Sequence, residues 1–233
     1  MGLFIAFEGG EGCGKSTQSK LLYERIIASG LSALLLHEPG GTFIGEEVRR
    51  ILLAERGSGK NKSTHKKNAT MNSLTELFLF SSARSELIEK AIIPNLDKDT
   101  IIICDRFIAS TIAYQGYGRQ IDLDIVKNII NFSTHGIKPD LTILLNIEPD
   151  NALKRVDSQL SLLDGITNAE AKDFPRLDQE GSRRFELESI NFHKRVHQGY
   201  INMSNDDTWL TIDGGQSIDE IHDAIWANIQ NRL

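Results

Sequence analysis

The 233-residue sequence has little cysteine, no long hydrophobic run and no excess of positive charge. Its two cysteines, Cys13 and Cys104, offer neither metal-site spacing nor a disulfide framework, so we expect reduced thiols. No apolar stretch approaches the roughly 18 residues of a membrane span, and no basic segment precedes the first apolar residues as in a signal peptide. The formal net charge of −6 argues against coating nucleic acid or anionic membrane. We therefore expect a cytoplasmic protein with neither of these as a partner.

What is present is an alternation of short apolar runs with longer amphipathic segments, typical of a parallel sheet covered by helices. The runs "TIIIC" and "LTILL" are continuously apolar, as in strands buried on both faces. We predict a three-layer α/β fold with a parallel sheet of about five strands, built as a single domain over residues 1–233. The expected strands are Leu3–Phe7, Ala33–His37, Thr100–Cys104, Leu141–Asn146 and Trp209–Asp213, and the expected helices are about 15–29, 43–54, 72–93, 107–115, 122–135, 149–163, 182–203 and 216–231.

The clearest motif lies directly after the first predicted strand, in "FEGGEGCGKSTQ". Gly9, four residues, then Gly14-Lys15-Ser16 form a complete phosphate-binding loop, with a strand before it and a helix after it. Glycines let backbone N–H groups turn inward around phosphates at a positive helix N-terminus. Lys15 would reach the β- and γ-phosphates, and Ser16 would ligate Mg²⁺. The predicted ATP-binding residues, 9–17, are Gly9, Gly10, Glu11, Gly12, Cys13, Gly14, Lys15, Ser16 and Thr17.

Phosphate loops serve switches, motors, pumps and kinases, so other features must select among them. A guanine-reading Asn-Lys-x-Asp is missing: the one Asn-Lys, at 61–62, lies in the polar, lysine-rich stretch 55–70, which we interpret as a surface loop. A kinase for a small acceptor needs a second anionic pocket lined with arginine and a segment that excludes water. The chain has residues for both, in an acceptor region of about 37–116 and a Gly-, Pro- and Arg-bearing segment of about 160–184.

Polar and aromatic residues gather after the second and third predicted strands. Pro39-Gly40-Gly41 forms a turn at the carboxyl end of a strand, where open α/β sheets bind ligands, and Arg49 follows it. Phe80 and Arg84 are four residues apart on one helix face, so a ring could stack on a base beside a guanidinium. Each of these residues, taken alone, also fits a purely structural role.

Asp105-Arg106 follows the buried third strand, so both charges emerge at the carboxyl edge of the sheet near the phosphate loop. A carboxylate there can organise Mg²⁺, and an arginine can neutralise phosphate. We therefore expect Ser16 and Asp105 at the metal.

In this order, "FEGGEGCGKST", "EPGGT", "LFSSAR", "DRFIASTIAYQG" and "KPDLTILL" resemble the thymidylate kinase family, P-loop nucleoside monophosphate kinases, over nearly the whole chain. The resemblance implies transfer of the γ-phosphate of ATP to dTMP with Mg²⁺, and a homodimer. It implies that Phe80 stacks on thymine, that Arg84 bonds its O4 and that Thr111 faces its N3 side. The implied dTMP-binding residues are Glu11, Arg49, Phe80, Arg84, Arg106, Ser110, Thr111, Tyr114 and Gln115.

The family supplies a catalytic arginine either from the phosphate loop or from a lid over the site. In this sequence the lid corresponds to the segment of about 160–184. The loop reads Glu11-Gly12-Cys13 without arginine, so the resemblance points to the lid, as in many bacterial members. The order we expect is Arg176, then Arg184. The implied catalytic residues are Lys15, Asp105, Arg106, Arg176 and Arg184.

Two departures from the family pattern stand out. Arg183 occupies a position where the family commonly has aspartate, and His37 one where it commonly has arginine. Two other functions stay open from the sequence: a kinase for another nucleoside monophosphate or deoxynucleoside, and a P-loop regulatory module that only hydrolyses nucleotide slowly. A regulatory module has no reason to carry Arg84, Arg106 and Thr111 together.

Overall fold

The computed structural model describes residues 2–53, 71–163 and 184–233. The lysine-rich stretch and nearly all of the predicted lid, including Arg176 and Arg183, lie outside these ranges. Within the described ranges, no helix has the length and apolar character needed to cross a membrane.

Five strands form one parallel sheet within the described residues, in the order β2-β3-β1-β4-β5. This arrangement confirms the predicted α/β fold class. The second, fourth and fifth strands have the predicted bounds, and the other two lie one residue later than predicted. The strands are β1 (Phe4–Glu8), β2 (Ala33–His37), β3 (Ile101–Asp105), β4 (Leu141–Asn146) and β5 (Trp209–Asp213).

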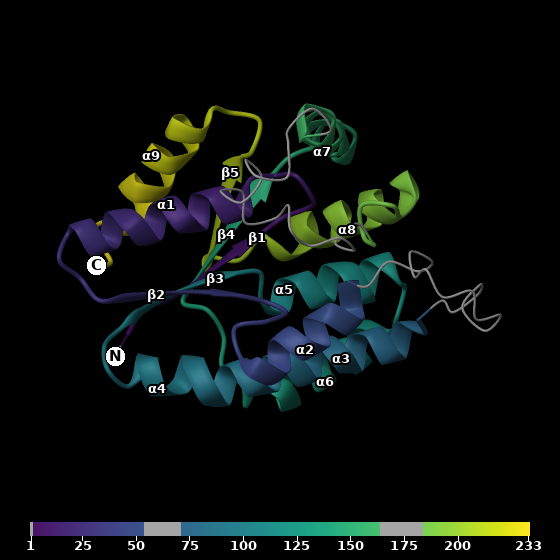
Figure 1. The fold of residues 1–233 in the computed structure, drawn as a ribbon, viewed down its shortest axis with the longest axis horizontal. Coiled ribbons are helices and arrows are strands. Elements are labelled where there is room, and N and C mark those ends of the chain that lie inside the picture. Colours follow the sequence, from purple (N-terminus) through teal and green to yellow (C-terminus); the bar gives the residue numbers. More distant parts are fainter. Residues whose placement is uncertain (1, 54–70, 164–183) are drawn as a thin grey trace.

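Helices cover both faces of the sheet (Figure 1). The described helical segments are α1 (Lys15–Ala28), α2 (Phe43–Leu53), α3 (Ser73–Leu87), the π-helical η2 (Ile88–Ile92), α4 (Ile93–Leu96), α5 (Ile108–Thr111), the π-helical η3 (Ile112–Gly118), α6 (Leu123–Thr134), α7 (Pro149–Leu163), α8 (Ile190–Met203) and α9 (Ile218–Ile229).

The side chains of the central strand β1 show how the three layers form. Ile5 and Phe7 point to the face covered by α1 and α9, in a cluster with residues such as Leu22 and Ile225. Phe4 and Ala6 point to the other face, where Leu87, Ile88, Ile92 and Phe107 cover them. Because successive strand residues alternate in direction, a continuously apolar strand serves both layers. Full burial of each large apolar side chain contributes about 1.5–3 kcal/mol.

The predicted helix of about 72–93 is helical in the structure, but it changes character before its carboxyl end and runs on to Leu96. It is regular only to Leu87, passes through the π-helical segment η2, and ends in the short α4 with Pro94 in its first turn. Proline has no amide hydrogen and its ring clashes with the carbonyl four residues earlier, so a wider turn precedes it. The predicted helix 107–115 similarly continues as η3 to Gly118.

The predicted helix 182–203 is wrong at its start. Arg184 to Leu187 form turns, and α8 begins only at Ile190. Ser189 is its N-cap: the serine hydroxyl accepts a hydrogen bond from the Phe192 amide at 3.3 Å. A serine before an apolar-periodic run is a helix start signal, and here it outweighs the helix-forming residues before it.

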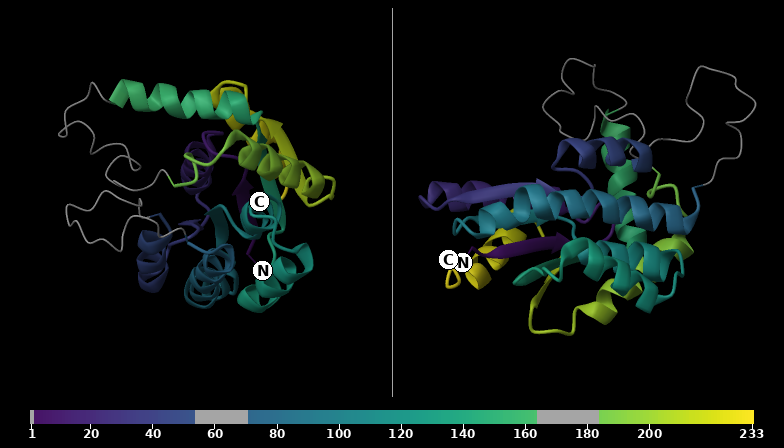
Figure 2. Two further views of the ribbon diagram at one scale, coloured as in Figure 1. Left: turned by 90° about the vertical axis from the view of Figure 1, so that its right-hand side faces the viewer. Right: turned by 90° about the horizontal axis from the view of Figure 1, so that it is seen from below.

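Both ends of the chain lie at one end of the molecule, on the left of Figure 1 and of the right-hand view in Figure 2. Strand β1 starts there, and α9 runs back towards it. The carboxyl edge of the parallel sheet therefore faces away from both ends, and it is at this edge that the polar residues described next converge.

Candidate active site

The loop after β1 encloses the Lys15 ammonium. Lys15 is 2% exposed, and its Nζ donates to the Gly10 carbonyl at 2.6 Å and lies 3.3 Å from Cys13 Sγ. Gly9 and Gly12 have φ of 142° and 69°, and a Cβ there would lie 2.7 Å from the Leu145 carbonyl oxygen and 2.6 Å from that of Ala152. Only glycine permits this backbone path. A buried cation inside a turn of glycines is the arrangement of an anion-binding loop.

Asp105 ends β3 beside this loop, because β3 pairs with β1 and places Phe7 opposite Asp105. The Ser16 hydroxyl, in the first turn of α1, donates a hydrogen bond to Asp105 Oδ2. A hydroxyl and a carboxylate are hard oxygen donors of the kind that Mg²⁺ prefers. In the described part of the chain no cluster of three or more His, Cys, Asp or Glu could hold a metal by itself.

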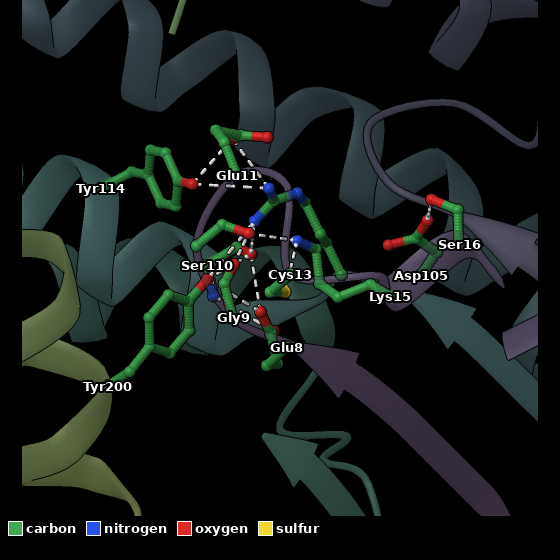
Figure 3. A network of polar contacts seen from close by, with 12 residues as sticks. Glu8, Gly9, Glu11, Cys13, Lys15, Ser16, Asp105, Ser110, Tyr114 and Tyr200 are labelled. Atoms are coloured by element: carbon green, nitrogen blue, oxygen red, sulfur yellow. Dashed lines mark hydrogen bonds and ion pairs between the residues drawn. The ribbon is translucent and has the colours of Figure 1, made fainter. Parts of the chain in front are cut away.

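Arg106 contacts a cluster of polar residues beside the loop. Figure 3 shows its partners Gly9, Glu11, Ser110, Tyr114 and Tyr200 gathered around one point. Its Nη1 donates to the Gly9 carbonyl at 3.0 Å, and its Nη2 lies 2.8 Å from Glu11 Oε1. The Tyr114 hydroxyl also donates to Glu11 Oε1, at 2.7 Å. Burial is the largest single influence on the pKa of Arg106 and acts to lower it, but Glu11, Tyr114, Tyr200 and Asp105 together outweigh burial and hold that pKa well above its ordinary value. Arg106 therefore keeps its positive charge beside the loop.

Arg84 lies in the interior beside the same segment. It is 1% exposed, forms an ion pair with Glu38, and donates from Nη2 to Thr111 Oγ1 at 2.5 Å. Burial raises the pKa of Glu38, and the Arg84 charge opposes that rise. Arg84 Nε and Nη1 have no hydrogen-bond partner among the described residues.

Three further residues implied for acceptor binding are Phe80 on α3, Gln115 on η3 and Arg49 on α2. The Phe80 ring lies 6.1 Å from the Phe185 ring at an angle of 50°. Gln115 is buried and donates from Nε2 to Glu76 Oε1 at 2.8 Å. Arg49 on α2 donates to the Pro39 carbonyl at 2.8 Å and so fastens the turn after β2.

Among the described residues, the polar contacts of Arg184 are with α2 and α3. It forms an ion pair with the buried Glu76 of α3, and its Nη1 donates to the Leu52 carbonyl at 3.1 Å. Arg119 binds the same Glu76 carboxylate. Arg184 is thus one of two arginines that neutralise a buried acid, whereas the position of Arg176 lies outside the described residues.

Several polar residues in this region escaped the sequence analysis. Glu8 and Tyr200 belong to the Arg106 cluster, Glu38 pairs with Arg84, and Glu76 holds Gln115. Glu8 carried a signal, since it is an acid that directly follows a run of five apolar residues. Tyr200 carried none, because it reads as one more core position of an amphipathic helix.

Comparison with known proteins gives a consistent result over the whole chain. The family model described as "Thymidylate kinase" matches residues 7–225. A thymidylate kinase from Geotalea daltonii is 39% identical over 235 residues, spanning 100% of this chain and 99% of the relative. One from Chlorobium limicola is 38% identical over 99% of this chain and 96% of the relative, and one from Dehalococcoides mccartyi is 40% identical over 97% and 94%.

Proposed function

The chain belongs to the thymidylate kinase family, and on that premise we propose that it transfers the γ-phosphate of ATP to dTMP, giving ADP and dTDP. The proposed kinase domain comprises the phosphate loop at 9–17, the acceptor region at about 37–116 and a lid at about 160–184. Its role in the cell is then a step in the synthesis of thymidine triphosphate.

One observation carries this proposal: the segment 105–115 contacts the phosphate loop at one end and the buried Arg84 at the other. Asp105 bonds Ser16, Arg106 bonds the Gly9 carbonyl, and Thr111 bonds Arg84. The Arg84 guanidinium also lies 5.7 Å from the Phe107 ring. A monophosphate acceptor needs such a segment, because its base and its phosphate must be held at once, in line with the donor.

We assign the charges to roles from their positions. Lys15 neutralises the donor phosphates and Arg106 the acceptor phosphate, while Asp105 and Ser16 would hold Mg²⁺. The metal, when bound, would offset negative charge on the phosphate oxygens. A nucleotide phosphate needs no deprotonation by the protein near neutral pH, so no general base is assigned. Catalysis then rests on positioning and charge neutralisation in a site with little water.

The acceptor contacts follow from the same geometry. Arg84 would donate to a base carbonyl from Nε and Nη1, which have no hydrogen-bond partner among the described residues, with Phe80 against the ring and Thr111 beside it. Tyr114 and Gln115 would line the sugar side, with Glu11 near the 3′-hydroxyl. Arg49, Arg106 and Ser110 would hold the phosphate.

A panel of acceptors tests the reaction. With ATP and Mg²⁺ we expect turnover to be fastest with dTMP, because a carbonyl accepts from Arg84 whereas the exocyclic amine of dCMP or dAMP cannot. EDTA should abolish turnover in the same assay. Faster phosphorylation of dCMP or dAMP than of dTMP would reject the assignment, and ATP hydrolysis without any acceptor product would favour a regulatory module.

The catalytic arginine is proposed to be Arg176, with Arg184 second, since Arg184 is engaged by Glu76 and by the Leu52 carbonyl. Arg176→Ala is expected to lower kcat about a hundredfold or more, as the loss of one transition-state donor does. Arg184→Ala should instead lower the melting temperature, because it leaves the buried Glu76 with less compensation. The reverse pattern, with kcat lost in Arg184→Ala alone, would transfer the catalytic role to Arg184.

We also propose a homodimer located in the cytoplasm. Large apolar side chains are exposed on one face of α3 (Leu74 and Phe78, four apart) and of α6 (Ile125 and Phe132, seven apart). Helices α3 and α6 pack against each other, so a second copy could cover both faces together. Sedimentation at equilibrium and cell fractionation would check the two proposals, and a purely monomeric protein would refute the first.

A further inference from the structure

A buried carboxylate that the proposed roles do not use lies next to Arg106. Glu8, the last residue of β1, is 0% exposed. Its Oε1 accepts from the backbone amides of Phe107 at 2.9 Å and Ser110 at 3.1 Å. Its Oε2 accepts from the hydroxyls of Ser110 at 2.6 Å and Tyr200 at 3.1 Å. Three of these donors belong to the segment after β3 that carries Arg106, and one belongs to α8.

Both hydroxyls also contact the Arg106 guanidinium. Arg106 Nη1 lies 3.1 Å from Ser110 Oγ and 3.4 Å from the Tyr200 hydroxyl. Each hydroxyl has one proton and two lone pairs. Glu8 Oε2 lies within hydrogen-bond distance of both hydroxyls, which also lie 2.9 Å from each other. With its proton directed to the carboxylate or to the other hydroxyl, each oxygen keeps a lone pair for the cation. Figure 3 shows Glu8, Ser110 and Tyr200 converging on one side of the cluster, with Glu11 and Tyr114 on the other.

The same network also fixes the backbone of Arg106. Arg106 has φ of 71°, in the left-handed region that a residue with a Cβ rarely adopts. The next residue, Phe107, donates its amide to Glu8, and Arg106 donates its own amide to the Phe7 carbonyl at 2.9 Å. The end of β1 thus holds the strained residue from both sides. Such strain persists only where surrounding contacts fix it, and it occurs most often at functional sites.

We propose that Glu8 and Tyr200 are positioning residues for the acceptor phosphate: Glu8 orients the Ser110 and Tyr200 hydroxyls so that both accept from Arg106 and fix its guanidinium. The inference rests on the proposed role of Arg106 in holding the dTMP phosphate. It makes α8 part of the acceptor site, although α8 supplies none of the residues assigned to substrate. Burial raises the pKa of Glu8, but the hydrogen bond from Ser110 and the Arg106 charge oppose the rise. All four donors can be satisfied only by the ionised carboxylate.

Tyr200→Phe tests the proposal with the smallest change, because the ring keeps its packing against Phe192 and Val196 and loses only the hydroxyl. We expect KM and Kd for dTMP to rise about fivefold to tenfold, the effect of losing one ordinary hydrogen bond, because Tyr200 acts through Arg106 and not on the phosphate itself. KM for ATP should not change. Glu8→Gln should act in the same direction and more strongly, since an amide NH₂ donates where the carboxylate accepted. Tyr117→Phe is the matched control: among the described residues, its hydroxyl accepts a hydrogen bond from Asn202 alone, so its constants should equal those of the wild type.

A double-mutant cycle separates this proposal from its premise. If Tyr200 acts through Arg106, then adding Tyr200→Phe to Arg106→Ala should change Kd for dTMP by less than about twofold. A lowered melting temperature in Tyr200→Phe with unchanged constants for dTMP would make the residue merely structural and overturn the proposal. Unchanged Kd for dTMP in Arg106→Ala would overturn the premise instead. If Glu8→Gln fails to fold, the constants of Tyr200→Phe alone test whether the Arg106 guanidinium is positioned in this way.

Discussion

Replacing Lys15 with alanine is expected to lower kcat about a thousandfold, or roughly 4 kcal/mol of transition-state stabilisation. Lys15 Nζ is buried inside the phosphate loop, with the Gly10 carbonyl at 2.6 Å. A positive charge with little water around it interacts strongly with a phosphoryl group, and nothing else in the loop carries one. The fold should persist, because α1 keeps its apolar contacts through Leu22 and Ile26.

The control for Lys15→Ala is Lys20→Ala on the same helix. Lys20 is exposed and makes one surface ion pair with Glu24 at 3.9 Å, a contact that contributes little. Steady-state turnover of dTMP and circular dichroism, measured on both variants, check the expectation. Retention of more than about a tenth of wild-type kcat in Lys15→Ala would remove this residue from the proposed mechanism.

Replacing Arg106 with alanine is expected to lower kcat/KM for dTMP about a thousandfold. Arg106 bonds the Gly9 carbonyl and the Glu11 carboxylate, so its guanidinium is fixed before substrate arrives. Removal deletes the charge assigned to the acceptor phosphate and the ion pair between Arg106 and Glu11. The Glu11 carboxylate would then repel an incoming phosphate more strongly. The loss in kcat/KM should therefore consist of both a rise in KM for dTMP and a fall in kcat.

Arg106→Lys and Arg50→Ala complete this experiment. Lysine keeps the charge and loses the planar fork, so Arg106→Lys should recover only part of the activity. Arg50 is exposed and pairs with its neighbour Glu47 on α2, and Arg50→Ala should behave as wild type. Initial rates over a range of dTMP concentrations, with ATP binding measured as a check of the fold, give the comparison. Wild-type kcat/KM in Arg106→Ala would contradict the assigned role.

Much of the fold could be predicted because its signals are local. A strand such as Leu141–Asn146 is visible as a continuous apolar run, and the bounds predicted for it are those observed. The phosphate loop is visible for the same reason, since its glycines and Lys15 lie within a few residues of each other. The helix boundaries that were predicted incorrectly also depend on local signals, but on signals that compete. Pro94 changes the geometry at the end of one helix, and Ser189 places the start of another helix later than predicted.

The sequence by itself determined the α/β architecture, the position of the loop and the family resemblance on which the function was inferred. The tertiary structure alone decided which charges meet. Glu8 and Tyr200 are 192 residues apart and bond each other beside Arg106, while Arg184 contacts Glu76 instead of the loop. Periodicity and motifs depend on neighbours along the chain, whereas the pairing of buried charges depends on which distant segments the fold brings together. Burial makes such pairing energetically decisive, because an unpaired charge in the interior costs several kcal/mol, on the order of the total stability.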